Sequence, residues 1–170
     1  MNSDADIPGE LIAMRRYARA LTRDDQDADD VVQDAILRAI ERKKSFKPEF
    51  SRRRWLLAIV HNVFISAKRR EAAEARRNDR FAETLERNPD LEQEQRVRLS
   101  RIASAYAGLP EHHRAVLHLI TVEGLSYQEA ADVLEIPLGT VMSRLSRARE
   151  ALKQREQGSP PLRIVGGGNG

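Results

Sequence analysis

The chain has 170 residues, of which 41% are hydrophobic and 32% are charged, and its net charge is +3. This length allows one domain or two small ones, with enough apolar residues for compact cores. The chain contains no cysteine, which excludes disulfides, thiolate zinc sites and cysteine nucleophiles. Residues 1–10 lack the apolar stretch of a signal peptide, and no apolar run approaches the ~18–20 residues of a membrane span. We therefore expect a cytoplasmic protein with no membrane partner.

An all-α fold is expected, because aromatic residues make up only 5% of the chain and β-branched runs are few. Residues 7–70 are predicted to form a first unit of three helices. The second of these begins in the acidic run 24–27 and ends in the basic run 42–44, as the helix dipole favours. The third is predicted from about 51 to 70, after a loop that contains Pro48.

A second helical unit is predicted at 95–157, separated from the first by a flexible linker at 71–94. The linker is rich in Glu, Arg, Asp and Asn and has little apolar surface to bury. The tail at 158–170 contains too much Gly and Pro to fold alone and is expected to be disordered. The expected fold is thus two small helical domains joined by a linker.

The stretch 125–152 has the pattern of a helix-turn-helix, a motif that places its second helix in the DNA major groove. Ser126 and Glu129 have the spacing of a capping box, which marks a helix start. Pro137 suits the end of the turn, and a second helix follows from about Leu138. The pattern favours duplex DNA binding over an ordinary amphipathic hairpin. Polar and basic residues cover its second helix outside the apolar stripe: Thr140, Ser143, Arg144, Arg147 and Arg149.

A second group of candidate residues surrounds the third predicted helix. Cations can follow phosphates, aromatic rings can stack on unpaired bases, and an amide can bind a base edge. We therefore favour nucleic-acid binding by the group as a whole over a solvated basic face, although core packing is the better interpretation for Trp55 alone. The group comprises Phe46, Phe50, Arg52, Arg53, Arg54, Trp55, His61, Asn62, Lys68, Arg69 and Arg70.

The second predicted helix has an acidic face, which should point away from DNA. From charge alone, a basic protein partner and a solvated face are equally good interpretations. This face comprises Asp29, Asp30, Gln33 and Asp34 and continues to Leu37.

An enzyme is the weakest interpretation of the sequence. The four histidines, His61, His112, His113 and His118, have no metal-binding spacing. Adjacent histidines on a helix also face different ways. We therefore predict no catalytic residue, metal or cofactor.

Three segments in this order resemble a bacterial RNA polymerase sigma factor of the extracytoplasmic-function (ECF) type, in the sigma-70 family. The region 2 core-binding helix of that family is similar to DADDVVQDAILRAI. Its −10 reading loop and helix are similar to SFKPEFSRRRWLLAIVHNVFISAKRR. Its region 4 is similar to LPEHHRAVLHLITVEGLSYQEAADVLEIPLGTVMSRLSRAREAL. The resemblance implies sigma region 2 at 7–70 and sigma region 4 at 95–157.

The resemblance implies roles for all three groups of residues. Asn62 matches the position near a flipped −10 base, Phe46 lies in the matching specificity loop, and Met142 departs from family members that carry Arg or Lys there. The −10 set is Phe46, Arg52, Arg53, Arg54, Trp55, His61, Asn62, Lys68 and Arg69. The −35 set is Ser126, Tyr127, Gly139, Thr140, Met142, Ser143, Arg144, Arg147 and Arg149. The set expected to bind the clamp helices of the polymerase largest subunit is Asp29, Asp30, Val31, Gln33, Asp34 and Leu37.

The run GTVMSRLSRAR is most similar to the subgroup that drives the alphaproteobacterial general stress response. That similarity implies promoter DNA, core polymerase and a small anti-sigma protein as partners. Two alternatives stay open: a sigma-like decoy that titrates an anti-sigma protein, and a helix-turn-helix regulator that is not a sigma factor.

Overall fold

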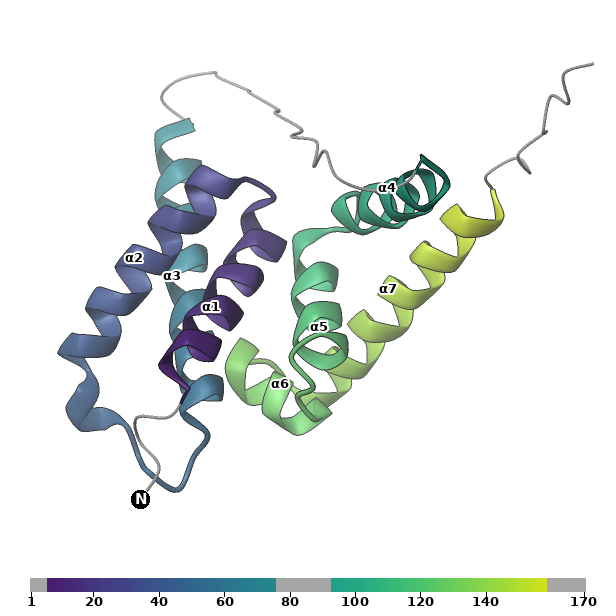
Figure 1. Cartoon of the computed structure of the whole chain (residues 1–170). Helices are drawn as coiled ribbons and strands as arrows, with labels where there is room; N and C mark the ends of the chain where they lie inside the picture. Colours follow the sequence, from purple (N-terminus) through teal and green to yellow (C-terminus); the bar gives the residue numbers. More distant parts are fainter. Residues whose placement is uncertain (1–5, 76–92, 159–170) are drawn as a thin grey trace, which may run out of the picture.

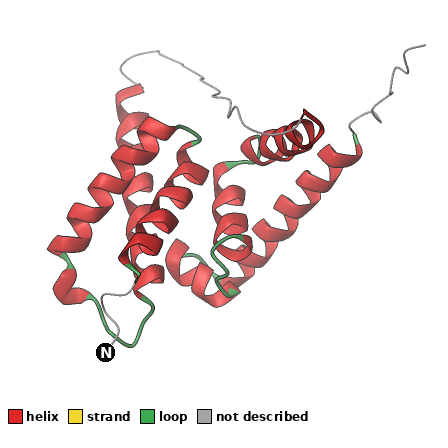
Figure 2. Ribbon diagram, viewed as in Figure 1, coloured by secondary structure: helices red, strands yellow, loops and turns green. Residues whose placement is uncertain are grey.

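The structure, a computed structural model, describes residues 6–75 and 93–158. Within these ranges it contains α-helices and one 3₁₀ turn and no β-strand, so the all-α prediction is confirmed (Figure 2). None of the described helices is long and apolar enough to cross a membrane. The predicted tail, apart from residue 158, and most of the predicted linker lie outside the described residues.

The N-terminal unit is a three-helix bundle in which each helix contacts the other two. The side chain of Asp24 accepts a hydrogen bond from the Asp27 amide and so caps the second helix, close to the predicted acidic start. The third helix continues beyond the predicted end at Arg70 to Ala75. The unit comprises α1 (Ile7–Thr22), α2 (Asp25–Glu41), the 3₁₀ turn η1 (Lys43–Ser45) and α3 (Arg52–Ala75).

The C-terminal unit is built around its last helix, which packs against the other three helices of the unit. Gly124 has φ 71°, a conformation that favours glycine, in the loop that leads to the helix-turn-helix. The unit comprises α4 (Gln93–Ala107), α5 (Glu111–Thr121), α6 (Tyr127–Leu134) and α7 (Leu138–Gln157).

The two units pack directly against each other. Helix α1 lies beside α5, and α3 contacts α6 (Figure 1). A single apolar core therefore runs through both units, from Met14 and Leu57 in the first to Leu119 and Val133 in the second. The basic helix α3 of the N-terminal unit therefore lies against the C-terminal unit. Some of its cationic side chains pair with carboxylates of that unit.

Helix α1 shows how this packing changes the pattern of burial. Leu11 shares the helical spacing of Met14, Ala18 and Leu21, but Leu11 is 41% exposed. Tyr17, which lies outside that spacing, is completely buried. Because α1 contacts α2, α3 and α5, it buries a face wider than the single stripe that periodicity predicts.

Candidate nucleic-acid interface

Helices α6 and α7 form the predicted helix-turn-helix. The Ser126 hydroxyl accepts a hydrogen bond from the Glu129 amide at 3.2 Å, and the Glu129 carboxylate accepts one from the Ser126 amide at 2.8 Å. This reciprocal pair confirms the predicted capping box. Glu135, with φ 53°, ends α6 in the left-handed conformation, and Pro137 immediately precedes α7. The start of α7 is therefore fixed by local chemistry on both sides of the turn.

The predicted −35 residues lie on the part of this motif that faces away from the core. The inner stripe of α7, formed by Val141, Leu145 and Ala148, is buried. Thr140 and Arg144 are half-buried beside it. The other members of the set are exposed: Ser126, Tyr127, Gly139, Met142, Ser143, Arg147 and Arg149.

The basic residues of α7 do not share one narrow face. Arg144 and Arg149 are separated by ~140° around the helix axis, from 3.6 residues per turn. Arg144 lies on the flank near α3 and α5, where its charge helps to lower the pKa of His61 and His112, after burial. Arg149 lies on the opposite flank. The two arginines are therefore placed to contact different parts of a DNA duplex.

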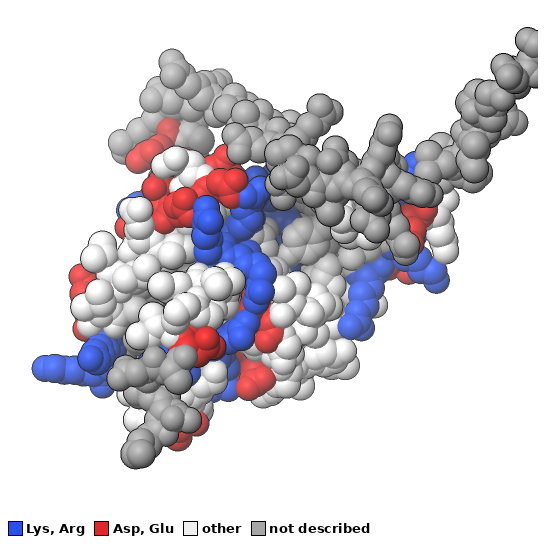
Figure 3. All heavy atoms as spheres, viewed as in Figure 1, with Lys and Arg blue, Asp and Glu red and all other residues white. Residues whose placement is uncertain are grey.

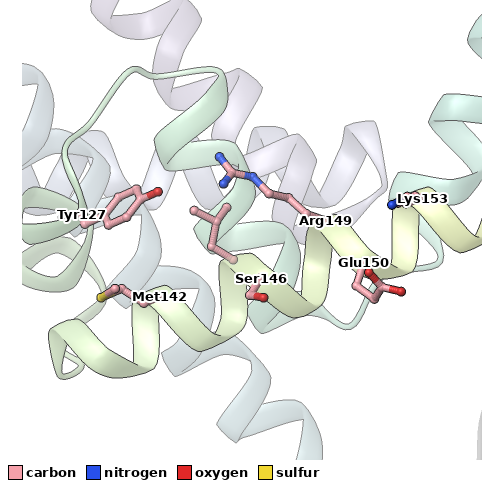
Figure 4. A pocket seen from close by; sticks show the side chains of 7 residues that line it. Tyr127, Met142, Ser146, Arg149, Glu150 and Lys153 are labelled. Atoms are coloured by element: carbon pink, nitrogen blue, oxygen red, sulfur yellow. The ribbon is translucent and has the colours of Figure 1, made fainter.

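The Arg149 flank contains a shallow hollow of about 340 Å³ (Figure 4). Tyr127 from the start of α6 and Met142 from α7 lie at one end of it, and Lys153 lies at the other. Ser146, which the sequence analysis did not select, lies between them on α7. An aromatic ring, a thioether, a hydroxyl, two cations and the Glu150 carboxylate thus line one surface. Such a surface offers both apolar contacts and phosphate-binding groups to a DNA groove.

The cations of α3 are mostly paired with carboxylates. Arg52 donates to Glu10 at 2.8 Å within the N-terminal unit. Arg54 lies 4.9 Å from the centroid of the Phe50 ring. Three further pairs link α3 to the C-terminal unit: Arg53 with Glu123 at 2.5 Å, Arg54 with Glu129 at 3.8 Å, and Lys68 with Glu111. Arg69 is exposed.

The aromatic members of the −10 set lie at the start of α3. The rings of Phe46 and Trp55 have centroids 5.2 Å apart, and both residues are half-buried. Trp55 packs against the apolar core, in agreement with the interpretation favoured for this residue by itself. Asn62, the residue matched to a flipped −10 base, is half-buried on α3.

His61 is held in a polar and aromatic stack rather than exposed to solvent. Its Nδ1 atom lies 3.0 Å from the Tyr17 hydroxyl. The Tyr17 ring stacks between the rings of His61 and His118, with centroids 6.2 Å and 5.4 Å away. Burial and, secondarily, the charge of Arg144 lower the pKa of His61 to about 4. His61 is therefore neutral at pH 7.

The acidic face of α2 is more exposed to solvent than the −10 residues at the start of α3. Asp30, Gln33, Asp34 and Leu37 are exposed, with Leu37 at 59%, whereas Val31 is buried. Asp29 is half-buried and accepts a hydrogen bond from Arg15 at 2.8 Å. Asp30, Val31 and Asp34 line one wall of a groove of about 340 Å³, to which α3 and α5 also contribute. This face combines carboxylates with apolar surface, which suits a basic, amphipathic protein partner.

The residues that join the two units, foremost Glu123, are not among the candidate residues named from the sequence. Its side chain has no exposed surface, and it accepts hydrogen bonds from Arg16 at 2.8 and 2.9 Å and from Arg53 at 2.5 Å. His118 Nε2 lies 3.0 Å from its Oε1 atom. Burial by itself would raise the pKa of the Glu123 carboxyl, but the hydrogen bonds from His118, Arg16 and Arg53 outweigh burial and lower it to about 2. In the sequence, the feature that could have indicated a buried Glu123 is the position of its carboxylate among the apolar residues Ile120, Val122 and Leu125.

Arg114 is the second such residue. It is 3% exposed and donates to the carbonyl oxygens of Ala20 at 2.9 Å and Leu21 at 3.1 Å, in the last turn of α1. It also donates to the Leu109 carbonyl. Its basic neighbours in the sequence are exposed or half-buried, so no pattern distinguished it.

Two protein-family models match the chain. A model described as the Sigma2 domain of PhyR matches residues 7–61. A model described as Sigma-70, region 4, matches residues 99–152. The second match contains the whole helix-turn-helix, and the first contains α1, α2 and the start of α3.

Whole-chain comparisons agree with these matches. The ECF RNA polymerase sigma factor EcfG of Rhodopseudomonas palustris is 33% identical, covering 97% of this chain and 95% of the relative. Among solved structures, the sigma factor RpoE of Bartonella quintana in complex with the anti-sigma factor NepR is 30% identical, covers 91% of this chain and 96% of that chain, and has a TM-score of 0.79. CnrH in complex with the cytosolic domain of CnrY is 28% identical, covers 90% and 86%, and has a TM-score of 0.62. The chain therefore belongs to the ECF RNA polymerase sigma factors of the sigma-70 family.

Proposed function

We propose that this chain directs core RNA polymerase to specific promoters by contacting two promoter elements with two surfaces. The exposed helix-turn-helix with its basic α7 supports duplex −35 recognition. The cation- and aromatic-bearing start of α3 supports binding of the melted −10 strand. The observation that carries the proposal is the presence of both surfaces in one chain of this family, together with a separate acidic face on α2.

The proposed site residues are the −10, −35 and core-binding sets defined from the sequence. Engaging two promoter elements at once raises the effective concentration of each contact, so individually weak contacts combine. The protein needs no catalytic residue, metal or cofactor for this role, because the polymerase supplies the chemistry. Since transcription is cytoplasmic in bacteria, we place the protein in the cytoplasm. The domain bounds 7–70 and 95–157 are part of this proposal.

We further propose control by a small anti-sigma protein in a general stress response. The support is the similarity to EcfG and to a sigma factor that was solved with the anti-sigma factor NepR. CnrH, which has a lower TM-score, was also solved with the cytosolic domain of a partner. The groove between α2, α3 and α5 and the exposed apolar residues on α2 and α4 supply surface for such a protein.

Run-off transcription with purified core polymerase on a promoter library tests the proposal. We expect transcripts that depend on this chain and share a −35 and a −10 motif. Arg144→Ala should cost about 1–3 kcal/mol at a −35 base that Arg144 contacts, whereas Glu156→Ala, at an exposed position near the end of the same helix, should be tolerated. If Arg144→Ala and wild type transcribe native promoters equally, the assignment of Arg144 to the −35 surface is wrong.

A decoy that titrates an anti-sigma protein is the second candidate, because the matching N-terminal family model is described as the Sigma2 domain of PhyR. A solved structure of the anti-anti-sigma factor PhyR with NepR shares the fold at 17% identity. The basic residues kept on α7 favour the sigma factor, since a decoy need not read DNA. A decoy would give no transcript in the run-off assay, and a regulator that is not a sigma factor would not bind core polymerase.

A further inference from the structure

The hollow beside α7 has an apolar end and a cationic end. Tyr127 and Met142 lie together at the apolar end (Figure 4). Leu145 also lines the hollow but is buried, whereas Met142 is 53% exposed and Tyr127 is 38% exposed. This end of the hollow therefore presents continuous apolar surface to whatever the helix-turn-helix binds.

The position of Met142 along α7 brings the apolar end to the base edges of bound DNA. Met142 is the fifth residue of α7, which begins at Leu138, and the first residues of a recognition helix contact the bases in the major groove. Lys153 comes eleven positions later, which is ~16 Å along the helix axis. Because the major groove is only ~12 Å wide, Lys153 reaches the phosphate backbone when Met142 faces the bases.

The polar groups of the hollow are available to bind phosphates. Lys and Arg side chains that gather along the boundary between the two halves of the molecule have acidic side chains beside them (Figure 3). In the hollow, by contrast, four polar side chains have no hydrogen bond or ion pair with any residue that the structure describes. The Glu150 carboxylate accepts a hydrogen bond from Gln154 at 3.0 Å, and two cations outweigh its charge. The four side chains are those of Tyr127, Ser146, Arg149 and Lys153.

The chemistry of Met142 limits which base it can recognise. A thioether has no hydrogen-bond donor and is only a weak acceptor, so it does not pair with the nitrogen and oxygen atoms at the base edges. The C5 methyl group of thymine is the apolar group that the bases present in the major groove. An apolar surface between Met142 and the Tyr127 ring therefore distinguishes base pairs by the presence of that methyl group.

We propose that Met142 and Tyr127 bind the methyl group of one thymine in the −35 element, while Arg149 and Lys153 bind the adjoining phosphates. This inference rests on the proposed function of the helix-turn-helix in −35 recognition. It divides the hollow into a part that specifies sequence and a part that binds all sequences alike. It also makes an A·T pair a required feature of the −35 motif.

Removal of the methyl group without any change in base pairing tests the proposal. Uracil is thymine without the C5 methyl group, so each thymine of the −35 element, on both strands, is replaced in turn by deoxyuridine. The duplex is a fluorescent promoter fragment selected in the run-off assay, and the protein is the complete chain assembled with core polymerase. For wild type we expect one position at which the replacement raises the dissociation constant about fourfold, as expected for the loss of one buried methyl group. In Met142→Ala the same replacement should raise it less than about 1.5-fold, because the two changes remove the same contact.

Three further variants separate apolar recognition from phosphate binding. Leu138→Ala is the matched control, since Leu138 is an apolar residue of α7 that is 42% exposed and is not among the residues that line the hollow. It should keep the fourfold effect of deoxyuridine. Arg149→Gln should weaken binding of the thymine and uracil duplexes equally and reduce the salt dependence by about one phosphate contact. Met142→Arg should change the preferred pair at that position from A·T to G·C, because arginine pairs with the guanine edge.

The outcomes separate this inference from the proposed function. If wild type is indifferent to every deoxyuridine, or selects a −35 motif without an A·T pair, the inference is wrong and the sigma-factor role stands. If the effect of deoxyuridine persists in Met142→Ala, or is lost equally in Leu138→Ala, Met142 does not bind the methyl group. If the assembled polymerase selects no −35 motif at all, the proposed function fails too, because the hollow then recognises no base.

Discussion

Replacing Arg114 by methionine should destabilise the protein strongly, because Arg114 joins helix ends from both units. Its guanidinium is buried and donates to Ala20 and Leu21 at the C-terminal end of α1 and to the loop after α4. Burial lowers its pKa, and none of the described salt bridges includes it. The cation is instead stabilised by carbonyl groups at the negative ends of helices.

The expected loss follows from these contacts. Arg114 donates four hydrogen bonds, to the carbonyl oxygens of Ala20, Leu21, Ala107 and Leu109. At a typical net contribution of about 1 kcal/mol for each bond, Arg114→Met should cost about 4 kcal/mol. Arg114→Lys keeps the charge but cannot present a planar fork, so it should cost about half as much. Arg147→Met, at an exposed position, is the control and should stay within about 0.5 kcal/mol of wild type.

Urea unfolding followed by circular dichroism measures these differences. A shift in the midpoint with an unchanged slope would report a change in stability alone. A loss below about 1 kcal/mol for Arg114→Met, or equal losses for Arg114→Met and Arg147→Met, would refute the view that this guanidinium holds the helix ends together.

Two further predictions concern local features. Ser126→Ala removes half of the capping box and should cost about 1 kcal/mol in thermal unfolding, whereas Ser143→Ala on α7 should cost less; equal losses would contradict the capping role. The pH dependence should follow His61, whose pKa is lowered to about 4 in the folded state. Its contribution to stability is present above pH 6.5 and is lost as the pH falls toward 4. Between pH 7 and pH 5 the free energy of unfolding should therefore fall by about 1–2 kcal/mol, and His61→Gln should remove most of that fall. If His61→Gln leaves the fall in the free energy of unfolding between pH 7 and pH 5 unchanged, other titrating groups cause that fall.

The sequence predicted the features that depend on neighbours along the chain. The capping box at Ser126 and the turn before α7 both follow from spacing and local chemistry. The resemblance to the family gave the order of the two units. These predictions succeeded because each involves residues within about two helical turns of one another.

The contacts between the units could not be predicted in the same way. Arg16 and Glu123 are 107 positions apart, and nothing in the spacing of either residue points to the other. Arg114 binds backbone carbonyl groups, which every residue possesses, so its partners leave no mark on the sequence. His61 looked like an exposed DNA contact because its stacking partners, Tyr17 and His118, come from two other helices.

The packing of the two units against each other makes the three candidate surfaces unequal. The acidic face of α2 and most of the −35 surface on α6 and α7 are exposed, whereas Arg53, Arg54 and Lys68 on α3 already have carboxylate partners. A protein partner of α2 can therefore bind without breaking these ion pairs, whereas DNA phosphates that bind Arg53, Arg54 or Lys68 must compete with carboxylates of the C-terminal unit.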